Sequence, residues 1–73
     1  MKTGQETLQI NNFCNGLSAA LSMAGVPAYL QYDNRTEHVD GFVDEKCVKI
    51  NVHMSSVAAS ARDIIRGLQG VLT

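Results

Sequence analysis

The chain has 73 residues, a formal net charge of −1 and a hydrophobic fraction of 45%. This length allows a single domain with one core, and the composition is that of a globular chain rather than a disordered one. The charge shows no basic excess of the kind that dedicated nucleic-acid-binding proteins carry. Cys14 and Cys47 are too few for a disulfide scaffold, so we expect two free thiols.

The beginning of the sequence has no apolar stretch behind a basic end, so we expect no signal peptide. No apolar run reaches the roughly 20 residues that a membrane span requires. We therefore expect a cytoplasmic protein without a membrane partner, folded as a single domain over residues 1–73. Residues 1–6 are either a disordered arm or the start of the first helix.

The first predicted element is a helix that ends near Ala24. Gly25 suits the position after a helix end, and Pro27 prevents the helix from continuing. The apolar residues at three-four spacing are Ile10, Phe13, Cys14, Leu17, Ala20, Leu21 and Ala24.

Two starting points for this helix remain open. Thr3 and Glu6 have the spacing of a capping box, which favours an early start. Asn11 or Asn12 are suitable caps for a shorter helix, in which case residues 7–10 form an extended arm.

Three short segments alternate between apolar and polar residues, as strands do: 28–32, 38–43 and 47–54. Residues 33–36 form a turn by composition, and we place the second turn at 44–46. The dipeptide Asp40-Gly41 offers an alternative hairpin turn, and a glycine inside a strand is also typical of a bulge. We expect Ile50, on the third strand, to lie at the centre of the core.

Ser55 or Ser56 is expected to cap a second helix, in which Gly67 weakens the helix by roughly 1 kcal/mol relative to alanine. The resulting order, α-β-β-β-α, predicts an α+β fold with two helices packed on one face of a three-stranded antiparallel sheet. The apolar face of this helix comprises Val57, Ala61, Ile64, Ile65, Leu68, Val71 and Leu72.

No group of residues predicts catalysis. Cys14 lies on the apolar stripe of the first helix, without the electropositive surroundings of a reactive thiolate. Cys47 and His53 are six residues apart on one strand, roughly 20 Å at the rise of an extended chain, which is too far for a Cys-His pair. These two residues and His38 do not converge on one ion. We therefore expect no catalytic residue, no metal site, no cofactor and no enzyme activity.

The helix-free face of the predicted sheet is the first candidate binding surface. Tyr29 and Phe42 are large aromatic residues among polar groups, an arrangement typical of interface anchors. The residues expected on this face are Tyr29, Gln31, His38, Asp40, Phe42, Lys49, Asn51 and His53.

The outward side of the first helix is the second candidate surface. No charged residue occurs from Thr7 to Tyr32, although solvated helices normally carry Glu, Lys or Arg. Small neutral side chains cost little to desolvate, which suits contact with another protein or with a second copy. The residues concerned are Gln9, Asn12, Asn15, Ser18, Ala19 and Ser22.

The element order and the length resemble those of the double-stranded-RNA-binding domain, over most of the chain but without shared motifs. The resemblance implies lysines at the start of the last helix, where that family grips the RNA backbone. Residues 54–60 contain no basic residue, so the RNA-binding residues have no counterparts in this chain. A nucleic-acid-binding or regulatory domain using Lys46, Lys49, Arg62 and Arg66 is kept as the alternative hypothesis.

These patterns predict a small non-enzymatic protein-binding module. We expect its partner to be another protein, or a second copy in a homodimer, rather than a nucleic acid. Small phage or mobile-element proteins that inhibit a host defence protein, such as anti-CRISPR proteins, act in this way. Such an inhibitor is the working hypothesis for this chain.

Overall fold

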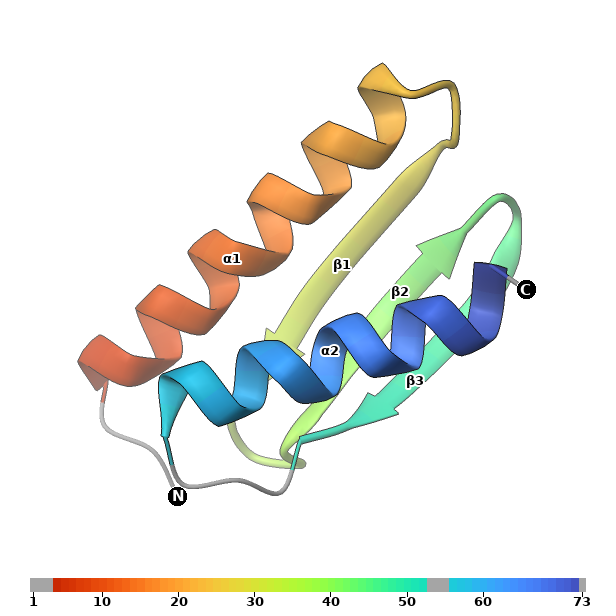
Figure 1. Ribbon diagram of the computed structural model, residues 1–73. Coiled ribbons are helices and arrows are strands. Elements are labelled where there is room, and N and C mark those ends of the chain that lie inside the picture. The colour runs from red at the N-terminus through yellow and green to blue at the C-terminus, as the bar shows by residue number, and fades with distance from the viewer. Residues whose placement is uncertain (1–3, 53–55, 73) are drawn as a thin grey trace.

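The computed structural model describes residues 4–52 and 56–72, and it has the α-β-β-β-α order and the α+β fold predicted from the sequence. Both strand pairs are antiparallel, and the middle strand is the second in the chain. Helix α1 contacts the first strand and helix α2 contacts the third (Figure 1). The elements are α1 Gly4–Met23, β1 Ala28–Asp33, β2 His38–Val43, β3 Lys46–Asn51 and α2 Val57–Leu72.

Helix α1 has the earlier of the two predicted starts, and it ends at the predicted stop. Residues 7–10 are helical, so they form no extended arm; Thr3 lies outside the described residues. At the other end the N–H of Val26 donates to the carbonyl of Leu21 at 2.8 Å, and the N–H of Gly25 donates to that of Ser22 at 3.0 Å. Gly25 has φ +90°, as this capping motif requires. None of the helices in the described part of the chain is long and apolar enough to span a bilayer.

The sheet has a regular register that excludes the alternative turn at Asp40-Gly41. Gly41 pairs with Leu30 on one side and Val48 on the other, so the strand passes through it without a bulge. The glycine is still required, because a Cβ at this position would overlap the backbone carbonyl of Tyr29. The second turn consists of two residues between β2 and β3, within the predicted range 44–46.

Helix α2 is capped by Ser56, whose Oγ accepts the N–H of Ala59 at 3.1 Å. Ser55 lies outside the described residues. Gly67, expected to be only a weak point, has a packing role: a Cβ there would lie 2.7 Å from Cγ2 of Ile50. The glycine lets α2 approach β3 closely.

Ile50 belongs to the core as expected, but the residues of β2 that face the core are buried more completely. Val39 and Val43 of β2 are fully buried, whereas Ile50 of β3 keeps a small exposed fraction. The reason is topological, because β2 has a strand on each side and β3 lies at an edge. On α2, Ile64 and Leu68 are buried as expected. Two other members of its predicted apolar face, Ile65 and Leu72, are exposed.

The free edge of β1 is covered by polar side chains of α1. The N–H of Leu30 donates to Oγ of Ser18 at 3.1 Å, and the N–H of Tyr32 donates to Oδ1 of Asn11 at 3.0 Å. Each of these α1 side chains also donates to the helix carbonyl four residues before it. Both outward N–H groups therefore have acceptors, although no strand lies on that side.

Candidate binding surface

The helix-free face of the sheet is built from alternate residues of all three strands. Three cross-strand rows follow from the register: Tyr29–Phe42–Cys47, Gln31–Asp40–Lys49 and Asp33–His38–Asn51. We call these residues the outer face. Every member of the predicted set that the structure describes lies in these rows, and His53 falls outside the described residues.

Tyr29 and Phe42 form an exposed aromatic pair in the first row. Their side chains keep 49% and 46% of their surface exposed. The ring centroids are 6.1 Å apart and the rings are tilted by 33°, within the range of favourable aromatic contacts. The hydroxyl of Tyr29 donates to Oε1 of Gln31 at 3.2 Å, which holds the ring against the sheet.

The other two rows are polar and of mixed charge. Asp40 and Lys49 are cross-strand neighbours of opposite charge, an arrangement that stabilises a sheet modestly. Asp33 adds a second carboxylate beside His38. Nδ1 of His38 is buried and has no hydrogen-bond partner among residues 4–52 and 56–72. With two carboxylates and one ammonium group, the outer face lacks the positive potential that a phosphate backbone requires.

Two members of the outer face were missing from the predicted set. Asp33 was assigned to a turn, but β1 extends through it and pairs it with His38. Cys47 was considered only as a possible catalytic or metal-binding residue; it lies opposite Phe42 and is exposed. Asp33 continues the alternation of Tyr29 and Gln31 along β1, and Cys47 begins that of Lys49 and Asn51 along β3. Extending the alternation to the strand ends would have identified both residues.

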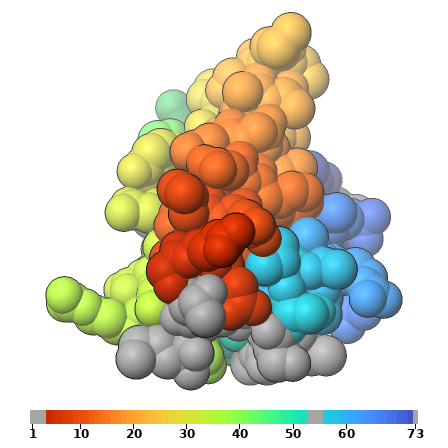
Figure 2. All heavy atoms as spheres, turned by 90° about the vertical axis from the view of Figure 1, so that its left-hand side faces the viewer, coloured from red at the N-terminus to blue at the C-terminus, as the bar shows by residue number. Residues whose placement is uncertain are grey.

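The second candidate surface, on α1, is only partly available. Figure 2 looks onto α1, which runs from the base to the apex of the molecule with α2 to one side. Ser18 was counted on this surface, but its hydroxyl points to β1 and binds the N–H of Leu30. Part of the charge-free stretch therefore covers the sheet edge. The exposed members are Gln9, Asn12, Asn15, Ala19 and Ser22.

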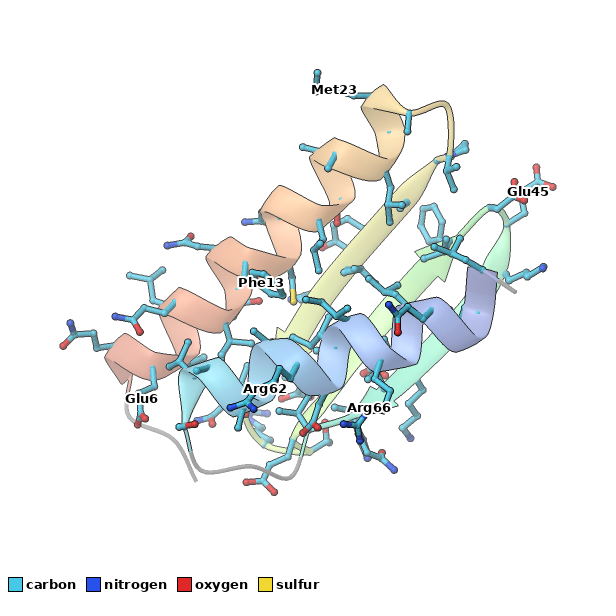
Figure 3. The ribbon with its side chains drawn as sticks, in the orientation of Figure 1. Glu6, Phe13, Met23, Glu45, Arg62 and Arg66 are labelled. Atoms are coloured by element: carbon cyan, nitrogen blue, oxygen red, sulfur yellow. The ribbon has the colours of Figure 1, made fainter. Side chains whose placement is uncertain are left out.

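The four basic residues of the nucleic-acid hypothesis do not all share one face, although Lys49 and Arg66 line the same hollow between β3 and α2. Arg62 and Arg66 project from the side of α2 that faces away from α1 (Figure 3). Lys49 belongs to the outer face, and Lys46 pairs with the inward-facing Val43. Within the described ranges, no group of three His, Cys, Asp or Glu side chains is placed to hold a metal ion.

No protein-family model matches the chain, and comparisons with curated proteins and with solved structures gave no significant match. Its function is therefore inferred from its residues and their geometry alone.

Proposed function

We propose that the chain is a non-enzymatic protein-binding module whose contact surface is the outer face. The observation that carries this proposal is the exposed aromatic pair of Tyr29 and Phe42. The core is filled from the opposite side of the sheet, and neither ring belongs to it. Exposed aromatic side chains surrounded by polar groups are typical anchors of protein interfaces.

The backbone geometry supports the same proposal. Tyr29 and Phe42 are directly opposite each other on paired strands, so their positions are set by the sheet rather than by a loop. A rigid anchor loses little conformational freedom on binding, which leaves more of the contact energy for affinity. Gln31, Asp40 and Lys49 form the next row and supply polar contacts that orient a partner.

A module that binds through such a face can inhibit its partner by covering a functional site on the partner's surface. This is how small inhibitors of host defence proteins, including anti-CRISPR proteins, act. We propose a cytoplasmic inhibitor of this class. The support for this class is the small size of the domain and its rigid outer face, which can cover a site on another protein.

The test uses a partner captured with the tagged chain from its source cells and then purified. Phe42→Ala should weaken binding at least roughly thirtyfold, because truncated aromatic anchors typically lose 2 kcal/mol or more. Met23→Ala is the matched control, since Met23 is an exposed apolar residue at the far end of α1. Circular dichroism and thermal melts check that each variant folds.

The competing surface is tested with Ala19→Arg, which places a charge on the exposed side of α1. Loss of binding with Ala19→Arg but not with Phe42→Ala would overturn the outer face as the site. Unchanged binding in both variants would overturn both surfaces. If the partner is a second copy, sedimentation should show a dimer that Phe42→Ala converts to a monomer.

A further inference from the structure

The two edges of the sheet differ in how the helices cover them. On β1 the outward N–H groups of Leu30 and Tyr32 bind side chains of α1. On β3 the N–H of Val52 donates to the carbonyl of Glu37, which shows that even-numbered residues pair with β2. The backbone groups of Cys47, Lys49 and Asn51 therefore point away from the sheet. No side chain within residues 4–52 and 56–72 forms a hydrogen bond with them.

Burial shows the same difference between the edges. The inward side chains of β1, Leu30 and Tyr32, are 1% and 3% exposed. Those of β3, Val48 and Ile50, are 8% and 7% exposed, the highest values in the core. The inward side of β3 is therefore slightly more accessible than that of β1, although Val52, just beyond β3, is fully buried.

A hollow of about 350 Å³ follows the open edge between β3 and α2. Ile50 and Val71 supply its apolar lining, and Gly67 keeps the helix close to the strand. Asp63 and Arg66 of α2 line it together with Lys49 and Asn51. A strand added beside β3 would direct alternate side chains into this hollow and the others alongside the outer face.

The charges at this edge favour an acidic partner. Strand β3 carries Lys46 and Lys49 and no carboxylate, and Arg66 adds a third cation at the hollow. Asp63 is the only carboxylate among the residues that line the hollow. If β3 paired with β3 of a second copy, the lysines of both copies would lie side by side. Lysines on an edge strand are known to oppose such pairing, because like charges repel. A phosphate backbone offers acceptors only, whereas the β3 edge presents both donors and acceptors.

We propose that β3 takes an extended, acidic segment of a partner protein as a fourth strand. The backbone of the segment pairs with Cys47, Lys49 and Asn51, an apolar side chain enters the hollow over Ile50, and a carboxylate lies near Lys49. This is the strand-addition mode of peptide recognition. This proposal goes beyond the contact through Tyr29 and Phe42. It uses backbone groups at an edge of the sheet, whereas that contact uses side chains on the outer face.

The probe is a synthetic peptide taken from a random ten-residue library selected on the folded chain. We expect the selected sequences to be rich in Asp and Glu and to alternate with apolar residues. Amide exchange measured by NMR should slow at Cys47, Lys49 and Asn51 when the peptide binds. Lys49→Pro removes one outward N–H and should bind at least about tenfold more weakly than Lys49→Gln, which removes only the charge.

The exchange measurement on the unmodified chain does not depend on how Lys49→Pro folds. Phe42→Ala should leave the affinity for the peptide within about threefold of the wild type. The proposal of binding through the outer face and the proposal of strand addition at β3 can therefore fail independently. The proposal is overturned if no peptide is selected, if selected peptides lack acidic residues, or if they protect other amides. Protection of the three amides in a dimer of the free chain would identify a second copy instead. Tighter, steeply salt-dependent binding of duplex RNA at this edge would identify a nucleic acid.

Discussion

The two cysteines illustrate how position alone separates chemically identical side chains. Cys14 lies on the inward side of α1 and is fully buried, and burial raises the pKa of its thiol from 9.0 to about 11. Cys47 lies on the outer face and is exposed. A reagent must reach the sulfur, so only Cys47 is accessible to it, and the raised pKa of Cys14 further lowers the reactivity of the buried thiol.

We expect the native protein to react with a thiol reagent at Cys47 and not at Cys14. Denaturation should release the second thiol, and Cys47→Ser should abolish the native reaction. A colorimetric thiol assay with and without denaturant measures both. Intact mass without reductant provides the check, since a mass two daltons lower than that of the reduced chain would reveal a disulfide and contradict this placement.

The raised pKa of Cys14 also makes stability depend on pH. In the folded chain the thiol keeps its proton up to about pH 11, whereas the unfolded chain releases it near 9.0. The folded state then binds more protons, so this contribution is fully present below pH 9 and is lost as pH rises through 11. Urea unfolding of the wild type and of Cys14→Ala should show their stability difference shrinking in this window. A constant difference would mean that Cys14 does not ionise on unfolding.

The tight turn between β2 and β3 contains local strain. Asp44 and Glu45 have φ of 52° and 67°, the left-handed values of a type I′ hairpin, which favours Asn-Gly. Glu45→Gly removes strain of roughly 1–2 kcal/mol and loses roughly 0.5–1 kcal/mol of backbone entropy. We expect a net gain of up to about 1.5 kcal/mol, seen as a melting temperature several degrees higher. Glu45→Ala keeps the strain and should show no gain; a less stable Glu45→Gly would contradict this account.

At the scale of elements, the helices show how one residue type takes opposite roles. A Cβ added to Gly16, in the middle of α1, would have no atom of another element within 4 Å, whereas Gly67 of α2 lies against Ile50. Helix propensity favours alanine at both sites by roughly 1 kcal/mol. The two glycines differ only in that Gly67 contacts the sheet and Gly16 does not.

We therefore expect Gly16→Ala to stabilise the protein by about 0.5–1 kcal/mol and Gly67→Ala to destabilise it by about 1–3 kcal/mol. The second effect arises because the new methyl group would force α2 away from Ile50. Chemical denaturation of the two variants, compared with the wild type, measures both. Equal stabilisation by both substitutions would show that Ile50 can move aside without loss.

At the scale of the molecule, the order of strands in the sheet determines which backbone amides are most protected from hydrogen exchange. Strand β2 is paired on both sides, β1 has one edge covered by α1, and β3 has one edge open. Local stability should therefore fall in the order β2, β1, β3.

Hydrogen exchange followed by NMR tests this order. The amides of Val39 and Gly41 should be among the slowest, and the outward amides of Lys49 and Asn51 among the fastest within the strands. Leu30 should exchange slowly despite its edge position, because its N–H binds Ser18. Ser18→Ala should accelerate exchange at Leu30 more than at Tyr32, which binds Asn11 instead. Fast exchange at Leu30 in the wild type would contradict the covered edge.

Local sequence patterns were sufficient for the elements and for most of the candidate site. The spacing from Ile10 to Leu21 and the Gly25 cap predicted α1 and its end, because helix periodicity and caps depend on residues only a few positions apart. Strand alternation assigned Tyr29 and Phe42 to one face for the same reason. Their contact depends on the register, which follows from turns at 34–37 and 44–45.

Interactions between distant residues decided the rest. Val39 is buried more completely than Ile50 because the order of strands in the sheet, not their hydrophobicity, makes β3 an edge. One edge is covered because the hydroxyl of Ser18 accepts the N–H of Leu30, and the other is open because no described side chain forms a hydrogen bond with the backbone of Lys49. Such contacts join residues that are far apart in the sequence, and local patterns carry no information about them. The amino-acid sequence by itself therefore determined which strand residues face the core and which face outward, and the tertiary structure decided which helix residues are buried and which edge of the sheet is open.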